Sequence, residues 1–152
     1  MKFNKDDPML LQQTAISLAV LGILATFSWE DYKHLSISPR HATLGEVALI
    51  FLLIGQVFLS PLFAAFQVLI GAAAFLLLFK PLKEILAPFD RTIIFLTLLV
   101  ATVPSLLALG IYLLYHALRA SQLKRNRIRA RLFPAMAHYA IAFAVALLIM
   151  LF

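Results

Sequence analysis

Two aspartates in this sequence stand where a pair of carboxylates can carry out acid–base chemistry. Asp31 ends the first apolar run and Asp90 begins the fourth, and the two intervening crossings return the chain to one face of a membrane. Two carboxylates close together at a low-dielectric boundary cannot both ionise cheaply, so one holds a proton while the other is charged. Such a pair can activate water and polarise a carbonyl, as aspartyl proteolysis requires. From the spacing alone, the simpler interpretation is that each aspartate is an interfacial charge, with Asp90 also pairing with Arg91.

Ionisable residues at a membrane boundary are costly to desolvate, so each is a functional candidate by default. The chain has only seven acidic residues, which allows each to be considered in turn. Charged residues near the two aspartates are expected to support them: Glu30, Lys33, Glu46 and Arg91. Glu46 lies one turn into an apolar run, and its simpler interpretation is an ion pair with Arg40 or His41 at the interface.

The composition identifies the class of protein that must position these residues. Of the 152 residues, 63% are hydrophobic and 13% are charged, whereas soluble domains average roughly 45–50% and 25%. A globule of this size leaves about a third of the surface of its unfolded chain in contact with water, so it cannot bury so much apolar surface. The composition therefore excludes a soluble enzyme domain and a disordered tail. It predicts an all-α, polytopic bundle of transmembrane helices that forms one domain, residues 1–152.

The apolar runs cover residues 9–29, 42–59, 62–79, 92–118 and 132–152. The first run is longer than the core of a signal peptide and lacks a cleavage site, so we expect it to be a retained helix. Ser60 and Pro61 predict a tight turn between the second and third runs, because proline lacks the amide hydrogen that a continuing helix needs. Five runs predict five helices, or six if one of them is broken.

The fourth run is the ambiguous one. Its length suits a single tilted helix, but Val103, Pro104 and Ser105 interrupt its middle, where proline removes a backbone hydrogen bond. A break there puts every basic residue except Lys2 and Lys5 on one side of the membrane, which the positive-inside rule favours. We therefore predict two helices that meet near Pro104. They must be packed inside the protein, where their free backbone groups can find partners.

The net charge of +6 is typical of cytoplasmic loops that contact anionic lipids. The basic segment from Arg119 to Arg131 is expected to set the topology and to bind such lipids, and no nucleic acid is expected as a partner. The chain has no cysteine, which excludes disulfides and thiolate metal sites. Neither a metal-ligating pattern nor a phosphate-binding glycine loop occurs, so no metal or cofactor is expected.

Three segments resemble motifs of the type IV prepilin peptidases, a family of membrane aspartyl proteases with a Gly-x-Gly-Asp motif. The first segment starts with Asp31, has Ile37 six positions later and continues to Pro39. The second, Ala-Pro-Phe-Asp, ends at Asp90 and falls where the family has Gly-x-Gly-Asp. In the third, Pro134 opens the last apolar run after a basic loop, as in the final motif of the family.

The resemblance implies a membrane endopeptidase in which Asp31 and Asp90 are the catalytic residues. Its substrate would be a pilin-like precursor, cut after a short basic leader at the cytoplasmic face of a bacterial or archaeal inner membrane. Components of a pilus or secretion machine would be further partners. Because the chain has no cysteine-rich insertion, it resembles the short members of the family, which act as peptidases only.

The second motif departs from the family pattern. Ala87 and Phe89 stand where the family has its two glycines, and the lysine two residues after the aspartate is absent. Glycines there would permit close backbone approach to a substrate. Two alternatives therefore stay open. One is a catalytically inactive membrane scaffold with the same fold, and the other is an unrelated small transporter or channel, for which Glu46 and the interrupted fourth run are the motivation.

Overall fold

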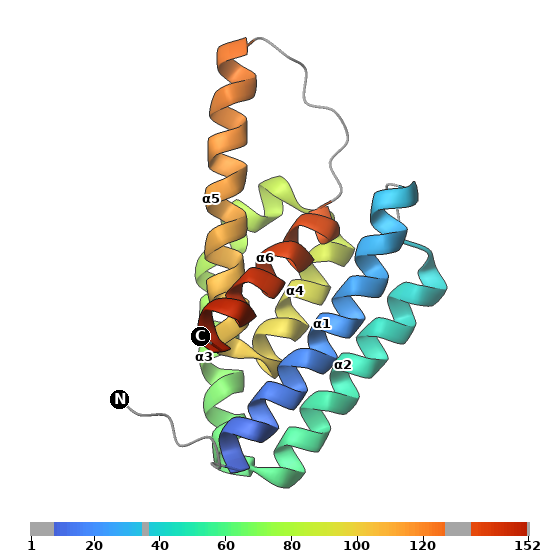
Figure 1. Ribbon diagram of the computed structural model, residues 1–152, viewed down its shortest axis with the longest axis vertical. Coiled ribbons are helices and arrows are strands. Elements are labelled where there is room, and N and C mark those ends of the chain that lie inside the picture. Colours follow the sequence, from blue (N-terminus) through green and yellow to red (C-terminus); the bar gives the residue numbers. More distant parts are fainter. Residues whose placement is uncertain (1–7, 35–36, 127–134, 152) are drawn as a thin grey trace.

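The chain folds into a bundle of α-helices (Figure 1). The computed structural model describes residues 8–34, 37–126 and 135–151, without the side chains of residues 84 and 120–126. The helices in these ranges are α1 (Pro8–His34), α2 (Pro39–Leu59), α3 (Pro61–Ile85), α4 (Pro88–Val100), α5 (Thr102–Asn126) and α6 (Ala135–Leu151). No strand occurs among the described residues, and the prediction of an all-α bundle of five or six helices is confirmed.

Three of the helices are long and apolar enough to cross a membrane. They are α1, α2 and the part of α3 from Pro61 to Lys83, while α6 is apolar but has only 17 residues. Large apolar side chains cover the outer surfaces of α2 and α3, and Phe58, Leu62 and Leu77 are among the most exposed. A helix of about 20 apolar residues spans the hydrocarbon core of a bilayer. These helices therefore indicate a membrane protein.

Four of the described helices begin at a proline, and the first of them is α1, at Pro8. α2, α3 and α4 start at Pro39, Pro61 and Pro88, each in the first helical turn, where the missing amide hydrogen costs nothing and the fixed φ favours a helix. The hydroxyl of Ser38 caps α2 by accepting a hydrogen bond from the amide of His41. The predicted turn at Ser60 and Pro61 is confirmed, since α2 ends at Leu59.

The fourth apolar run is broken, as the charge distribution predicted, but the break lies at Ala101 and not at Pro104. Proline disrupts the hydrogen bond to the residue four positions earlier, so the carbonyl of Val100 loses its helical partner. The side-chain amide of Gln56, a residue that is 1% exposed, donates to that carbonyl at 2.8 Å. Pro104 therefore occupies the first turn of α5, where proline is tolerated, and the backbone group that it leaves open is satisfied from α2.

The break returns α5 to the end of the bundle at which the polar segments before it lie, which we call the polar end. α1, α3 and α5 finish at the polar end and α2, α4 and α6 begin there, with α5 extending beyond the other helices (Figure 1). The described residues of the polar segments 30–41 and 80–91 lie at this end, as predicted. Residues 1–7, with Lys2 and Lys5, residues 35–36, and residues 127–134, with the last part of the basic segment and Pro134, lie outside the described ranges.

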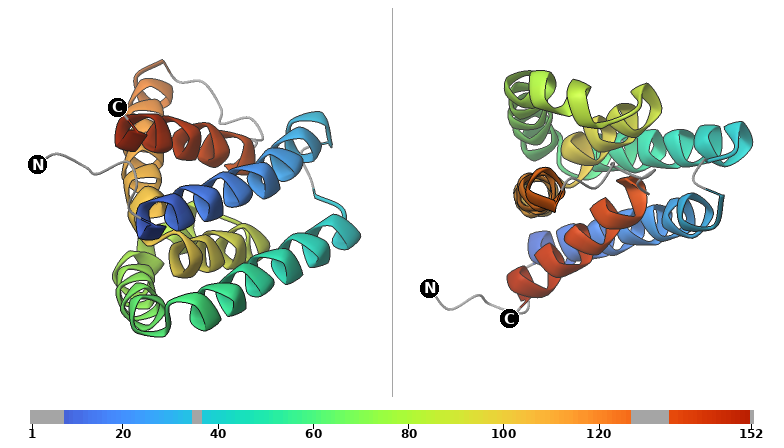
Figure 2. Two further views of the ribbon diagram at one scale, coloured as in Figure 1. Left: turned by 60° about the horizontal axis from the view of Figure 1, so that its bottom comes forward. Right: turned by 90° about the horizontal axis from the view of Figure 1, so that it is seen from above.

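α4 lies in the centre of the bundle, where Figure 2 shows it between α2, α3 and the pair formed by α1 and α6. Its side chains from Ile93 to Val100 are mostly buried. Gly71 lets α3 approach it closely, because a Cβ at that position would lie 2.5 Å from the carbonyl oxygen of Leu98. Small residues permit such close backbone contact between helices in membranes.

We predict that Gly71→Ala destabilises the bundle by about 1–3 kcal/mol, because the added methyl group meets backbone and not a movable side chain. Thermal unfolding in detergent measures the effect. Gly22→Ala is the matched control: a Cβ there meets nothing within 4 Å, so the exchange should be neutral or stabilising by about 0.5–1 kcal/mol. Equal stability of the two variants would show that α3 and α4 can separate without cost.

Candidate active site at the polar end

Asp31 lies in the last turn of α1 and its side chain joins this helix to α6. The residue is 8% exposed, and its Oδ2 atom accepts hydrogen bonds from the backbone amides of Met136 at 2.9 Å and Ala137 at 3.4 Å. These are the second and third residues of α6, whose amides have no partner within the helix. The carboxylate therefore caps a helix that is distant in sequence, at the positive end of the α6 dipole.

Asp90 lies in the first turn of α4 and is half-buried. Burial, followed in size by the negative charge of Asp31, raises the pKa of Asp90 to about 6, against a partial opposing effect of a hydrogen bond with the backbone of Ala87. The carboxyl group of Asp90 therefore lies within the range of the charge of Asp31. The two aspartates that the sequence singled out, here called the aspartate pair, both lie at the polar end.

Aromatic packing holds the ends of α1 and α4 against each other beneath the aspartate pair. The rings of Phe27 and Phe89 meet edge to face, with centroids 5.9 Å apart. Gly45 of α2 makes room for this contact, because a Cβ there would collide with the ring of Phe27. Phe89, which stands where the prepilin peptidases have a glycine, therefore fills the space between two helices.

Tyr112 of α5 adjoins the aspartate pair and was not found by sequence reasoning. It is almost fully buried, and the charges of Asp31 and Asp90 both act on its phenol. Its hydroxyl lies 3.0 Å from Nε2 of His116, one turn along the same helix. A tyrosine in an apolar run has no signal that distinguishes it from a packing residue, and only the folding of α5 back to the polar end brings it to the aspartates.

Glu30 and Lys33 lie near Asp31 in sequence but line a separate hollow between α1 and α2. Glu30 pairs with His41 of α2, with Oε1 and Nδ1 2.8 Å apart. The expected pairing of Glu46 with His41 is therefore wrong, because His41 is nearer to Glu30 at the helix ends. Glu46 is partly exposed on α2 and has no hydrogen-bond or ion-pair partner within the described ranges.

Arg91 turns away from its neighbour Asp90. Its Nε atom lies 3.5 Å from the carbonyl oxygen of Ala87, and its guanidinium lies 5.8 Å from the centre of the ring of Phe79. In the described part of the chain, Arg91 and Asp90 form no ion pair. Arg91 therefore does not neutralise Asp90, which fits the raised pKa of the Asp90 carboxyl.

The arrangement offers two carboxyl groups with different preferences for a proton. Asp31 accepts hydrogen bonds from two amides at the N-terminus of α6, and burial together with the charge of Asp31 raises the pKa of Asp90. Groups whose environments separate their proton affinities in this way can act as base and acid in one reaction. Among the described residues, no cluster of three or more metal-ligating side chains occurs.

Comparison of the chain with models of known protein families, with curated proteins and with solved structures finds no match. What the site can do must therefore be argued from its own geometry.

We predict that Asp31→Ala destabilises the protein by about 1–2 kcal/mol, the usual effect of deleting a capping side chain. The amides of Met136 and Ala137 lose their acceptor, so their hydrogen exchange should accelerate. Asp31→Asn is the matched control, because an asparagine oxygen can still accept these hydrogen bonds and should retain most of the stability. Unchanged exchange in the Ala variant would contradict the contact.

Proposed function

We propose that the chain is an integral-membrane aspartyl endopeptidase that resembles the prepilin peptidases and cleaves pilin-like precursors. The observation that carries the proposal is the placement of Asp90, which begins α4, beside Asp31, which ends α1. The two lie 59 residues apart in the sequence, at the positions where the resembled motifs have their aspartates. A half-buried pair of this kind is suited to holding one proton between two carboxyl groups.

In this proposal Asp31 is the base and Asp90 is the acid. The ionised carboxylate of Asp31 takes a proton from a water molecule, which then attacks the carbonyl carbon of the scissile peptide. Asp90, protonated at the start, donates a hydrogen bond to the carbonyl oxygen and stabilises the charge that develops there. Burial of Asp90 supports this assignment because it favours the neutral form of the acid.

The proposed setting is a bacterial or archaeal inner membrane that the chain crosses several times. Basic residues at the polar end support a cytoplasmic location for that end, because cytoplasmic segments carry an excess of lysine and arginine. On α1, α2, α3 and α4 they are Lys33, Arg40, Lys80, Lys83 and Arg91. The aspartate pair would then meet the peptide just inside the cytoplasmic surface, where a precursor presents its basic leader. The basic segment would contact anionic lipids at the same surface.

We predict that Asp31→Asn and Asp90→Asn each abolish cleavage of a pilin-like precursor, by at least about a thousandfold, while the variant proteins stay in the membrane. Both substitutions keep the size of the side chain and remove its ability to exchange a proton. Co-expression with a tagged precursor, followed by separation of precursor from product, measures processing. Asp7→Asn, in the polar N-terminal tail, is the control that should process normally. If both Asn variants at the aspartate pair still process the precursor, the assignment is wrong.

The pH dependence of cleavage follows from the sign of the shift at Asp90. Its pKa lies above the ordinary value, so the acid is protonated at low pH and loses its proton as the pH rises through about 6. We predict that kcat/KM falls above that pH by about tenfold per unit. A continuous fluorogenic assay between about pH 5 and pH 8 tests this. A rate that stays constant over that range would exclude Asp90 as the acid.

One observation favours a second candidate, a non-catalytic scaffold subunit of a pilus or secretion machine. Asp31 caps α6 and Asp90 lies where its carboxyl meets the backbone at the start of α4, so each has a structural use without catalysis. Ala87 and Phe89, which stand where the prepilin peptidases have glycines, also fit a non-catalytic subunit. This candidate predicts wild-type protein that cleaves no pilin-like peptide and co-purifies with other membrane components of such a machine.

A further inference from the structure

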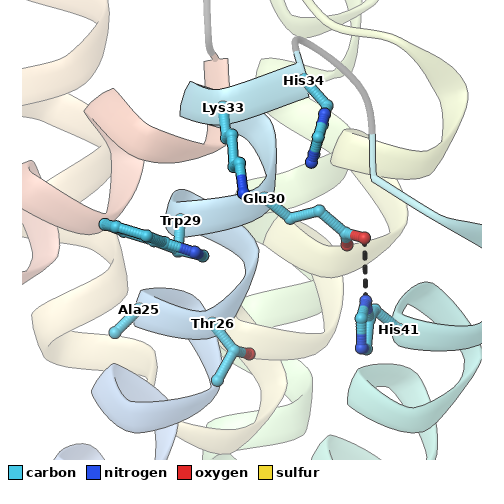
Figure 3. Close-up of a pocket in the computed structure, with 7 residues that line it drawn as sticks. All are labelled: Ala25, Thr26, Trp29, Glu30, Lys33, His34 and His41. Atoms are coloured by element: carbon cyan, nitrogen blue, oxygen red, sulfur yellow. Dashed lines mark hydrogen bonds and ion pairs between the residues drawn. The ribbon is translucent and has the colours of Figure 1, made fainter.

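The ends of α1 and α2 enclose a hollow that the aspartate pair does not use. Its volume is about 560 Å³, and its lining comes from the last three turns of α1 and from the first turn of α2. The lining residues are Ala25, Thr26, Trp29, Glu30, Lys33, His34 and His41 (Figure 3). Neither Asp31 nor Asp90 lines it, because Asp31 faces α6 from another side of α1.

The hollow has a basic upper part and an apolar lower part. Lys33 and His34, in the last turn of α1, point into it from above, and His41 closes it from α2 (Figure 3). Ala25 and Thr26 line it about two turns lower. Its polarity therefore changes along the helix axis, in the direction that crosses the surface of a membrane.

Glu30 points toward His41 at one side of this hollow (Figure 3). Its Oε1 atom pairs with Nδ1 of His41 at 2.8 Å, and its Oε2 atom is shielded from solvent. The ammonium group of Lys33, which is exposed, is the cationic group that the hollow presents to a ligand. An anion with several oxygen acceptors fits such a basic group, because charge-assisted hydrogen bonds to phosphate are strong.

The position of the hollow identifies the source of that anion. α1 and α2 are both long and apolar enough to span a membrane, so their ends lie at the depth of the lipid head groups. Trp29, 72% exposed at the rim, is of the residue type that is enriched at this depth. A ligand there has a phosphate above and acyl chains below, which matches the change of polarity in the hollow.

We infer that the hollow between α1 and α2 is a binding site for the phosphodiester head group of a membrane phospholipid, with Lys33 holding the phosphate and Trp29 contacting the glycerol and upper acyl region. The site is independent of the proposed protease activity, since it shares no side chain with the aspartate pair. A lipid bound there would join the helix ends next to Asp31.

The fluorescence of Trp29 tests this inference, because it is the only tryptophan in the chain and lies in the proposed site. The full-length protein in a neutral detergent is titrated with short-chain phosphatidylglycerol, with short-chain diacylglycerol, which lacks the phosphate, and with inorganic phosphate. Phosphatidylglycerol should give a saturable change in emission. The other two ligands should give none, or should saturate at concentrations at least about tenfold higher.

Two variants separate the role of Lys33 from general attraction by basic residues. Lys33→Gln should weaken phosphatidylglycerol binding by about fivefold to tenfold, the effect of losing one charge-assisted contact. Lys83→Gln removes an exposed charge at the same end of the bundle, on α3 and outside the hollow, and should leave the affinity unchanged. Circular dichroism confirms that both variants are folded.

The other outcomes overturn the inference. Diacylglycerol that binds as tightly as phosphatidylglycerol would make the site apolar only, and inorganic phosphate that binds equally well would make it a site for a free anion. An affinity for phosphatidylglycerol that is the same in the wild type and in Lys33→Gln would show that Lys33 does not hold the phosphate. None of these readouts depends on cleavage, so they stand whether or not the proposed protease activity is found.

Discussion

The carboxylate of Asp31 satisfies two needs of the bundle with one contact. The first amides of α6 have no partner within their own helix, and a buried carboxylate needs donors for its charge. The hydrogen bonds that the amides of Met136 and Ala137 donate to Asp31 satisfy both the amides and the carboxylate. They also fix the last helix of the chain beside the first and keep a negative charge at the point where α4 begins. The raised pKa of Asp90 follows from that charge together with burial.

At the opposite end of the bundle, uncharged side-chain amides satisfy a backbone group that has no partner within its helix. Pro104 leaves the carbonyl of Val100 without a helical donor, and Gln56 supplies one. The same side-chain amide donates to Gln67, whose own amide donates to Gln13 of α1. Three glutamines thus link α1, α2 and α3 to the break between α4 and α5. In an apolar bundle, backbone groups freed by a break must be satisfied by the protein itself.

The contacts at the two ends of the bundle differ in whether they respond to pH. The amide chain at the break involves no ionisable group, so it holds helices together without responding to pH. The aspartate pair exchanges protons, and its two members compete for them. Among the described residues, the coupled acidic groups therefore lie at the polar end, to which α5, turned back by the break, also brings Tyr112.

Much of the fold could be predicted from the sequence, because long apolar runs and prolines act locally. The helices, the turn at Pro61 and the existence of a break all follow from residues close to the features that they determine. The break was placed a few residues late, since proline acts on the carbonyl four positions before it. The proximity of Asp31 and Asp90 was predicted from the parity of membrane crossings alone.

What could not be predicted depends on contacts between helices. Nothing near Asp31 in the sequence indicates that its carboxylate caps a helix that begins a hundred residues later. Glu30 competes with Glu46 for His41, and only the distance between the ends of α1 and α2 decides the outcome. The role of Phe89 in packing against Phe27 likewise needs the arrangement of α1 and α4.

The central claim is that the aspartate pair holds one proton, on Asp90, while Asp31 is ionised. Infrared titration of the carboxylic acid band tests it most directly, because the chain has only seven acidic side chains to contribute. Between about pH 5.5 and pH 6, where ordinary carboxyl groups are ionised, we predict a carboxylic acid band that is absent in Asp90→Asn. In Asp31→Asn the band should titrate at lower pH, since the neighbouring charge is gone. A band that survives in Asp90→Asn, or a midpoint unaffected by Asp31→Asn, would contradict the account.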